Sequence, residues 1–240
     1  MRALILSGAG RYAEPWHRFP ETSARLADLV AEAGYEVDVR EDVDAAIAGL
    51  GDDVRLLVVN AGDPDRPGSS DGDPAVDASA VDPAALDAAL DRGIGILVVH
   101  SGASSLRDYD AFDRAIGGRW EHDVSWHPPF GEATVHLVGH HPVREGLDDF
   151  TVEDERYSGL VLHDVIEPIA EHEEDGIRHP IVWAREIGRS RLVYDALGHD
   201  TRSYESPGHR ALIASALDWL SHVPAPSRAD RAIPPVGGAA

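Results

Sequence analysis

Polar side chains follow two of the apolar segments at the point where each would end as a β-strand. His100 and Ser101 come directly after the run 94–99, and His199 and Asp200 follow a later strand-like run. In open α/β sheets, ligands bind beyond the carboxyl ends of the strands, so these four are candidate catalytic residues. Histidine can act as a general base near neutrality, and a serine in a strand-to-helix turn can act as a nucleophile. The alternative is that Ser101 or Ser104 caps the following helix.

An acidic segment, 153–157, adds a carboxylate and a phenol to the candidates. Acidic runs usually form a solvated face, but here Glu155 and Tyr157 stand beside an arginine. Glu155 could orient a catalytic histidine or act as an acid, which makes it a further candidate catalytic residue.

Histidines also occur in the aromatic segment 120–130. His122 and His127 are five residues apart, a spacing that could hold a metal ion in a loop, although the sequence has no H-E-x-x-H pattern. A set of nitrogen and oxygen ligands would suit zinc, manganese or iron. The candidate metal ligands are His100, His127 and His199. His17 and several other histidines have no sequence context that singles them out.

The composition excludes several kinds of chemistry. The 240 residues contain no cysteine and no lysine. The first absence rules out disulfides, thiolate zinc sites and iron–sulfur clusters, and the second rules out a pyridoxal-phosphate lysine. With 21 arginines against 43 acidic residues the formal charge is −22, so neither nucleic acid nor an anionic membrane is an expected partner. The chain has no run of eighteen apolar residues and no signal peptide, and we expect a cytoplasmic protein.

The elements that must position these residues alternate, through the first half, between strand-like runs and helical patterns. That alternation is typical of a parallel βαβ sheet. Strands are predicted at 2–6, 35–39, 55–60 and 94–99, and helices at 22–33, 43–50, 83–92 and 105–116. The most apolar of these strands, 94–99, is expected to be central, and the alternating 35–39 is expected to lie at an edge.

The second half has a different pattern, with little helix before its end. Strand-like runs are predicted at 133–138, 161–169, 181–184 and 192–196, followed by an amphipathic helix at 208–220. We expect one α/β domain over 1–222. A loop at 61–81 has no assigned role. The Pro/Ala/Gly-rich tail, 223–240, could pack across a second copy in a homo-oligomer or along its own subunit.

A glycine motif near the start of the chain is a weak indication of nucleotide binding. Residues 8–13 match G-x-G-x-x-A after a strand, but Pro15 follows at once and the next helix begins late. We therefore expect a flexible turn at the end of the first strand and no nucleotide cofactor.

Several segments, taken in order, resemble the trehalose-utilisation, or ThuA-like, family. The resemblance extends over 4–220 and rests on 141–147, Phe150 with 154–157, 179–183, 188–194, 197–200 and 217–220. It implies the fold of the class I glutamine amidotransferase-like superfamily, a flavodoxin-like, mostly parallel sheet with helices on both faces. It also implies a role in carbohydrate metabolism, with glycosides or keto-disaccharides as the substrate class.

The amidotransferases place a nucleophilic cysteine in the turn after a central strand and a histidine at the end of a later strand. By that resemblance the turn is 100–102 and the later histidine is His199. Because cysteine is absent, glutamine hydrolysis by the thiol route is excluded. Two departures from the family pattern are the loop 61–81 and Ser190, which stands where a glycine is often found.

Two functions remain open. The first is an enzyme, a hydrolase or lyase acting on a sugar derivative by His/Glu acid–base or metal-assisted chemistry. Its candidate substrate-binding residues are Trp16, His122, Trp126, His127 and Tyr157. The second is a non-catalytic sugar-binding or interaction domain that has the amidotransferase-like fold without its cysteine. Convergence of His100, Glu155 and His199 on one pocket would favour the enzyme, and scatter would favour the binding domain.

Overall fold

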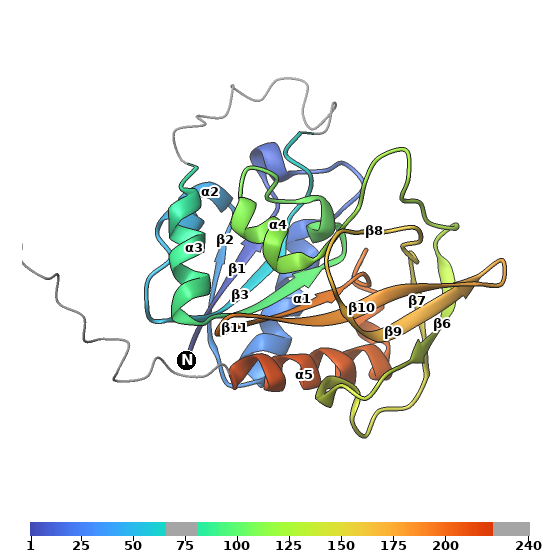
Figure 1. Ribbon diagram of the computed structural model, residues 1–240. Helices are drawn as coiled ribbons and strands as arrows, with labels where there is room; N and C mark the ends of the chain where they lie inside the picture. Colours follow the sequence, from blue (N-terminus) through green and yellow to red (C-terminus); the bar gives the residue numbers. More distant parts are fainter. Residues whose placement is uncertain (66–80, 223–240) are drawn as a thin grey trace, which may run out of the picture.

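A nine-stranded sheet forms the centre of the computed structural model, which describes residues 1–65 and 81–222 (Figure 1). Five strands make its parallel half, in the spatial order β2-β1-β3-β4-β11. Their bounds are β1 (Arg2–Ser7), β2 (Glu36–Arg40), β3 (Val54–Asn60), β4 (Gly95–Val99) and β11 (Ser190–Asp195). This is the flavodoxin-like strand order, and the fold class expected from the sequence is confirmed.

An antiparallel half continues the sheet from β11 in the order β10-β9-β6-β7. These strands are β10 (Ile177–Ile187), β9 (Glu167–Glu174), β6 (Gly131–Leu137) and β7 (Phe150–Asp154). A separate two-stranded sheet pairs β5 (Gly118–Arg119) with β8 (Val161–Leu162). The sequence did not predict β7, and the predicted strand 161–169 is divided between β8 and β9, because a turn separates the two pairings.

Helices cover both faces of the parallel half (Figure 1). The two longest, α1 (Phe19–Glu32) and α5 (Pro207–Ser221), pack together on one face. On the other face lie α2 (Val43–Ala48), α3 (Pro83–Arg92) and α4 (Asp110–Ile116). The predicted helix 105–116 begins only at Asp110, because 105–109 forms a turn in which Leu106 has a φ of +50°. Before it, a short 3-10 helix, η3 (His100–Ser104), turns the chain over the end of β4.

Burial explains why the central strands are continuously apolar. Leu56 to Val59 of β3 and Ile96 to Val99 of β4 are fully buried, since helices cover them on both sides. As expected, β4 is central, with β3 and β11 as its neighbours, and β2 is an edge strand. This stack of apolar strands is a rigid base for the turns at its carboxyl edge.

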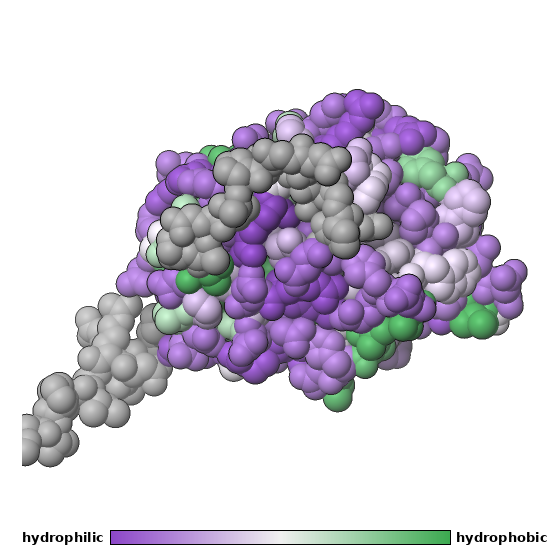
Figure 2. Space-filling view, turned by 90° about the horizontal axis from the view of Figure 1, so that it is seen from above, coloured by the Kyte–Doolittle hydropathy of each residue, from purple (hydrophilic) through white to green (hydrophobic). Residues whose placement is uncertain are grey.

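The surface reflects the acidic composition. The face in Figure 2 is mainly hydrophilic, with apolar side chains scattered in small groups. In the part of the chain that the structure describes, no helix is both long and apolar enough to span a membrane. Most of the loop 61–81 and the whole tail 223–240 lie outside the described residues.

Candidate functional site

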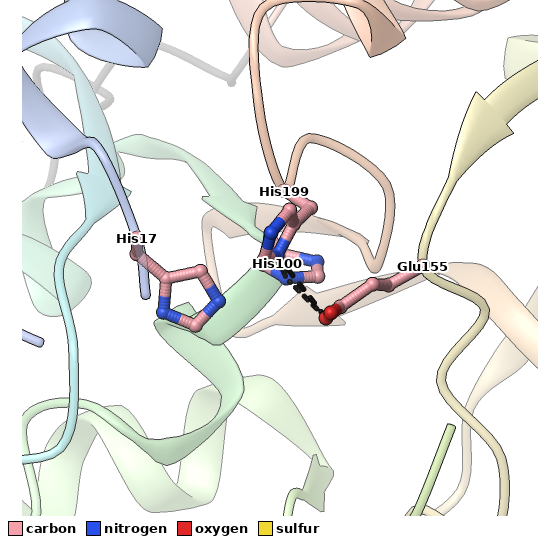
Figure 3. Close-up of side chains that lie close together, drawn as sticks. All are labelled: His17, His100, Glu155 and His199. Atoms are coloured by element: carbon pink, nitrogen blue, oxygen red, sulfur yellow. Dashed lines mark hydrogen bonds and ion pairs between the residues drawn. The ribbon is translucent and has the colours of Figure 1, made fainter. Parts of the chain in front are cut away.

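Four side chains from distant parts of the sequence meet at one end of the sheet. They are His17, His100, Glu155 and His199, here called the His₃Glu cluster (Figure 3). Each offers one nitrogen or oxygen atom, and these atoms all lie within 4.8 Å of one another.

Strand direction explains why these residues share an edge. His17 follows β1, His100 begins the turn after β4, and His199 lies in the loop after β11, and all three strands are parallel. Glu155 follows β7, which is separated from β11 by four antiparallel pairings and therefore runs in the same direction. The carboxyl ends of all four strands consequently face the same side of the sheet.

Three members of the cluster are in direct contact. Glu155 Oε2 lies 3.1 Å from His199 Nδ1 and 3.5 Å from His100 Nε2, and these two nitrogens are 3.3 Å apart. The ring of His17 completes the group, with its centroid 4.9 Å from that of His100 and 5.0 Å from that of His199.

The turn that presents His100 is strained. His100 has a φ of +48°, in the left-handed region, where a non-glycine residue costs about 1–3 kcal/mol. Its Nδ1 donates to the Ala196 carbonyl at 2.7 Å, which aims Nε2 at the cluster. Gly102 lets the turn pass close to the sheet, since a Cβ there would lie 2.9 Å from the Val59 carbonyl oxygen. His100 is the first residue of the turn 100–102, which the amidotransferase resemblance equates with the turn of the nucleophile.

His17 is oriented by a neighbouring carboxylate. Its Nδ1 donates to Glu14 Oε2, and Glu14 Oε1 accepts from the Asp63 amide at 2.9 Å. Among the described residues His17 Nε2 is buried without a hydrogen-bond partner, and the side chain is only 7% exposed. A carboxylate–histidine pair with the far nitrogen left unpaired is the arrangement found around metal-ligating histidines.

Burial and attraction between neighbouring groups shift the pKa values in the cluster in opposite directions. Burial alone would raise the pKa of the Glu155 carboxyl, but His100 and His199 hold that pKa well below its ordinary value. Burial likewise opposes the charged form of His100, yet Glu155 and Asp154 raise its pKa. For His17 burial dominates and lowers the pKa to about 4, although Glu14 acts in the opposite direction.

A pocket of about 230 Å³ opens above the cluster. It brings together most of the residues that the sequence suggested: Trp16, Ser101, His122, His127, Glu155 and Tyr157. The Tyr157 hydroxyl is 3.0 Å from His100 Nε2, and His127 Nε2 is 3.7 Å from Glu155 Oε2. Ser101 Oγ is buried and has no hydrogen-bond partner among the described residues. Ser101 lines the pocket, and its hydroxyl caps no helix in the described part of the chain.

Two candidates lie outside this constellation. Trp126 forms a backbone bridge with Ser158 and packs its ring against His179, away from the pocket lining. The Asp200 carboxylate pairs with Arg202 and is not a member of the cluster. The Trp126 ring packs against His179 and the Asp200 carboxylate pairs with Arg202, so neither side chain is part of the cluster.

The sequence pattern did not single out His17 or its partner Glu14. The available signal was position, because both follow the first strand of a parallel sheet, at the edge where the other candidates were sought. The candidate metal ligand His127 lies beside Glu155, whereas His17 takes the fourth place in the cluster.

The donor atoms fit a divalent ion. Ligands bound at about 2.1 Å lie about 3.4 Å apart along a tetrahedral edge, close to the separations among Glu155, His100 and His199. At such an ion every pair of donors lies about 3.4 Å apart, so the widest separation in the cluster, at most 4.8 Å, would have to shorten by up to about 1.4 Å. Three imidazoles and a carboxylate suit zinc, manganese or iron.

Fold and site together define a flavodoxin-like α/β protein with a histidine–carboxylate site at the carboxyl edge of its sheet. The chain belongs to the ThuA family, described as trehalose utilisation, whose model matches residues 2–220. No curated protein matches the sequence.

Solved structures share this fold at low sequence identity. A ThuA-like protein from Parabacteroides merdae is 16% identical, with a TM-score of 0.72 over 95% of this chain and 92% of that chain. A ThuA-like protein from Bacteroides uniformis, also 16% identical, has a TM-score of 0.68 over 91% and 90%. A β-galactosidase from Halorubrum lacusprofundi matches over 94% of this chain but 31% of its own, with 15% identity and a TM-score of 0.55.

Proposed function

We propose that this chain is a metal-dependent enzyme that acts on a sugar derivative, with the ion held by His17, His100, Glu155 and His199. The observation that supports it most is the convergence of these four side chains from four strand ends, with the Nε2 of His17 buried and without a hydrogen-bond partner in the described part of the chain. A buried imidazole nitrogen without a partner costs about 1–3 kcal/mol, so a ligand at this position would recover that energy.

The family supports the choice of substrate class. A member of a trehalose-utilisation family acts, by this proposal, on a glycoside or an oxidised disaccharide. The pocket suits such a molecule because the rings of Trp16 and Trp120 offer apolar faces beside hydroxyl and imidazole groups. A bound divalent ion would supply Lewis-acid polarisation of a substrate oxygen.

Other side chains that line the pocket would bind the sugar and transfer protons. His127 and Tyr157 line the pocket next to Glu155 and His100, within reach of a bound sugar. His127 is the more exposed of the two and is placed to exchange a proton with substrate. The Ser101 hydroxyl, which has no hydrogen-bond partner within 1–65 and 81–222, would donate to a substrate oxygen, and the Trp16 and Trp120 rings would exclude water from one side.

Elemental analysis of protein purified without a histidine tag is the first test. We expect about one zinc, manganese or iron per chain, lost on chelation and regained on adding the metal, with turnover of keto-glycosides following the metal content. The double variant His100→Ala/His199→Ala should bind none. Wild-type protein that neither contains nor takes up metal would contradict the proposed centre.

The same experiment separates the enzyme from the sugar-binding domain. If the metal is present but no sugar derivative is turned over, while binding is seen by calorimetry, the binding domain is the better description. A metal-free protein that still turns over a keto-glycoside would point to a His/Glu acid–base site.

A further inference from the structure

One buried carboxylate joins the two loops that supply Glu155 and His199. Asp154, the last residue of β7, is fully buried and precedes Glu155. Its Oδ1 accepts from the amides of Glu155 at 2.8 Å and His199 at 3.2 Å, and its Oδ2 accepts from the amide of Gly198 at 2.7 Å. Two of these amides belong to members of the His₃Glu cluster.

We infer that Asp154 is the positioning residue of the cluster, fixing the backbones of Glu155 and His199 against each other; this inference rests on the proposed metal-dependent function. No strand pairing links the end of β7 to the loop after β11, because three strands of the sheet lie between β7 and β11. The Asp154 carboxylate therefore supplies a direct link between two segments that the sheet itself does not hold together.

The link depends on the chemistry of a carboxylate. Two oxygens accept three amide protons, and hydrogen bonds to a charged acceptor are stronger than those between neutral groups. An asparagine at this position would turn an NH₂ group toward at least one backbone N–H, leaving two donors face to face in a buried place. Asp154 thus holds its neighbours in a way that its amide isostere cannot.

The adjoining loop favours the same arrangement. Gly198 has a φ of +112°, and a Cβ there would lie 2.7 Å from the Tyr204 hydroxyl oxygen and 2.8 Å from a Val99 methyl carbon. This conformation directs the amides of Gly198 and His199 together toward Asp154. The His199 ring then lies over Glu155, with its Nδ1 3.1 Å from Oε2.

The test compares Asp154→Asn with Asp195→Asn. Asp195 is a matched control because it is also a buried carboxylate at a strand end, but its partners are the Leu197 amide and His209, neither of which belongs to the cluster. We expect Asp154→Asn to weaken Zn²⁺ affinity about 10- to 100-fold, measured by chelator competition, the usual loss for a group that orients metal ligands. Asp195→Asn should retain an affinity within about three-fold of wild type, whatever it does to the melting temperature.

Amide hydrogen exchange on the wild-type protein without metal gives a second measurement that needs no variant. The amides of Glu155 and His199 should be protected to the level of the central strands. Equal Zn²⁺ affinity in wild type and Asp154→Asn, equal losses in the two variants, or rapid exchange at both amides would overturn the inference. If wild type binds no Zn²⁺, the proposed function fails, and the exchange rates alone decide the role of Asp154.

Discussion

Two buried polar atoms in the lining of the pocket have no hydrogen-bond partner among the described residues. His17 Nε2 and Ser101 Oγ are both buried without hydrogen-bond partners among the described residues, and both residues line the pocket. Each unpaired group lowers the stability of the free protein by about 1–3 kcal/mol. A bound ligand that completed the bonding would recover this cost, which makes these two residues informative positions for mutation.

His17→Gln tests whether His17 is a metal ligand. Glutamine keeps a polar side chain of similar length but removes the imidazole lone pair, so we expect metal affinity to fall at least ten-fold. His122→Gln is the control, because His122 lines the same pocket but pairs with Asp63, outside the cluster. Metal content after dialysis measures both, and equal retention by the two variants would contradict a ligand role for His17.

Ser101→Ala should separate stability from activity. Removing a buried hydroxyl that has no partner among the residues the structure describes is expected to leave the free energy of unfolding unchanged or raise it by up to about 2 kcal/mol, while turnover falls. Ser104→Ala is the contrast, because the Ser104 hydroxyl donates to the Ser101 carbonyl at 2.8 Å. Its loss should destabilise the protein by about 0.5–1.5 kcal/mol in urea denaturation. A destabilised Ser101→Ala protein would show that this hydroxyl has a structural partner.

At the scale of elements, helix α5 is tied to the sheet by a buried ion pair. His209, in the first turn of α5, is fully buried, and its Nε2 lies 2.8 Å from Asp195 Oδ2 at the end of β11. The Nδ1 of the same ring lies 2.9 Å from the Ser203 hydroxyl oxygen. Because burial removes both charged groups from water, the strength of this tie depends on protonation.

His209→Gln should reveal a pH-dependent contribution to stability. Burial disfavours the charged form of His209, but Asp195 and, further off, Asp154 raise its pKa above the ordinary value of 6.5. A raised folded-state pKa stabilises the fold fully below the unfolded pKa, and this contribution is lost as the pH rises through the folded pKa. The difference in unfolding free energy between wild type and variant should therefore be larger at about pH 5.5 than at about pH 9. A difference that grows with pH would show that His209 is neutral in the fold.

At the scale of the molecule, the dominant property is negative charge. The chain has 43 acidic residues and 21 arginines, so at least 22 carboxylates have no arginine to neutralise them. Many of the ion pairs are exposed and each contributes little to stability. The net effect of charge on the fold is therefore self-repulsion.

Salt should stabilise this protein. Raising NaCl from about 0.05 M to about 0.5 M shortens the screening length to a few ångströms, which weakens repulsion between distant carboxylates. We expect the melting temperature to rise, and to rise equally in KCl if screening is the cause. A melting temperature that falls with salt would mean that the ion pairs outweigh the repulsion.

Local patterns in the sequence determined most of the architecture. The apolar run of β4 predicted a central strand, and Pro83 and Gly93 marked the two ends of α3. These signals are local because burial and capping act on consecutive residues. The strand β7 was missed because its five residues, Phe150–Asp154, include two acids and pair only at the sheet edge.

The sequence by itself also placed His100 and His199 at strand ends, since a parallel sheet gathers its carboxyl termini on one side. Only the tertiary structure decided which other residues join them. Glu155 was already a candidate from the sequence, but its contact with His199 depends on strand order and on the Asp154 link, and His17 joins through strand order alone. The local pattern can show that a residue follows a strand, but not which residues come into contact, because those distances exist only after the sheet has formed.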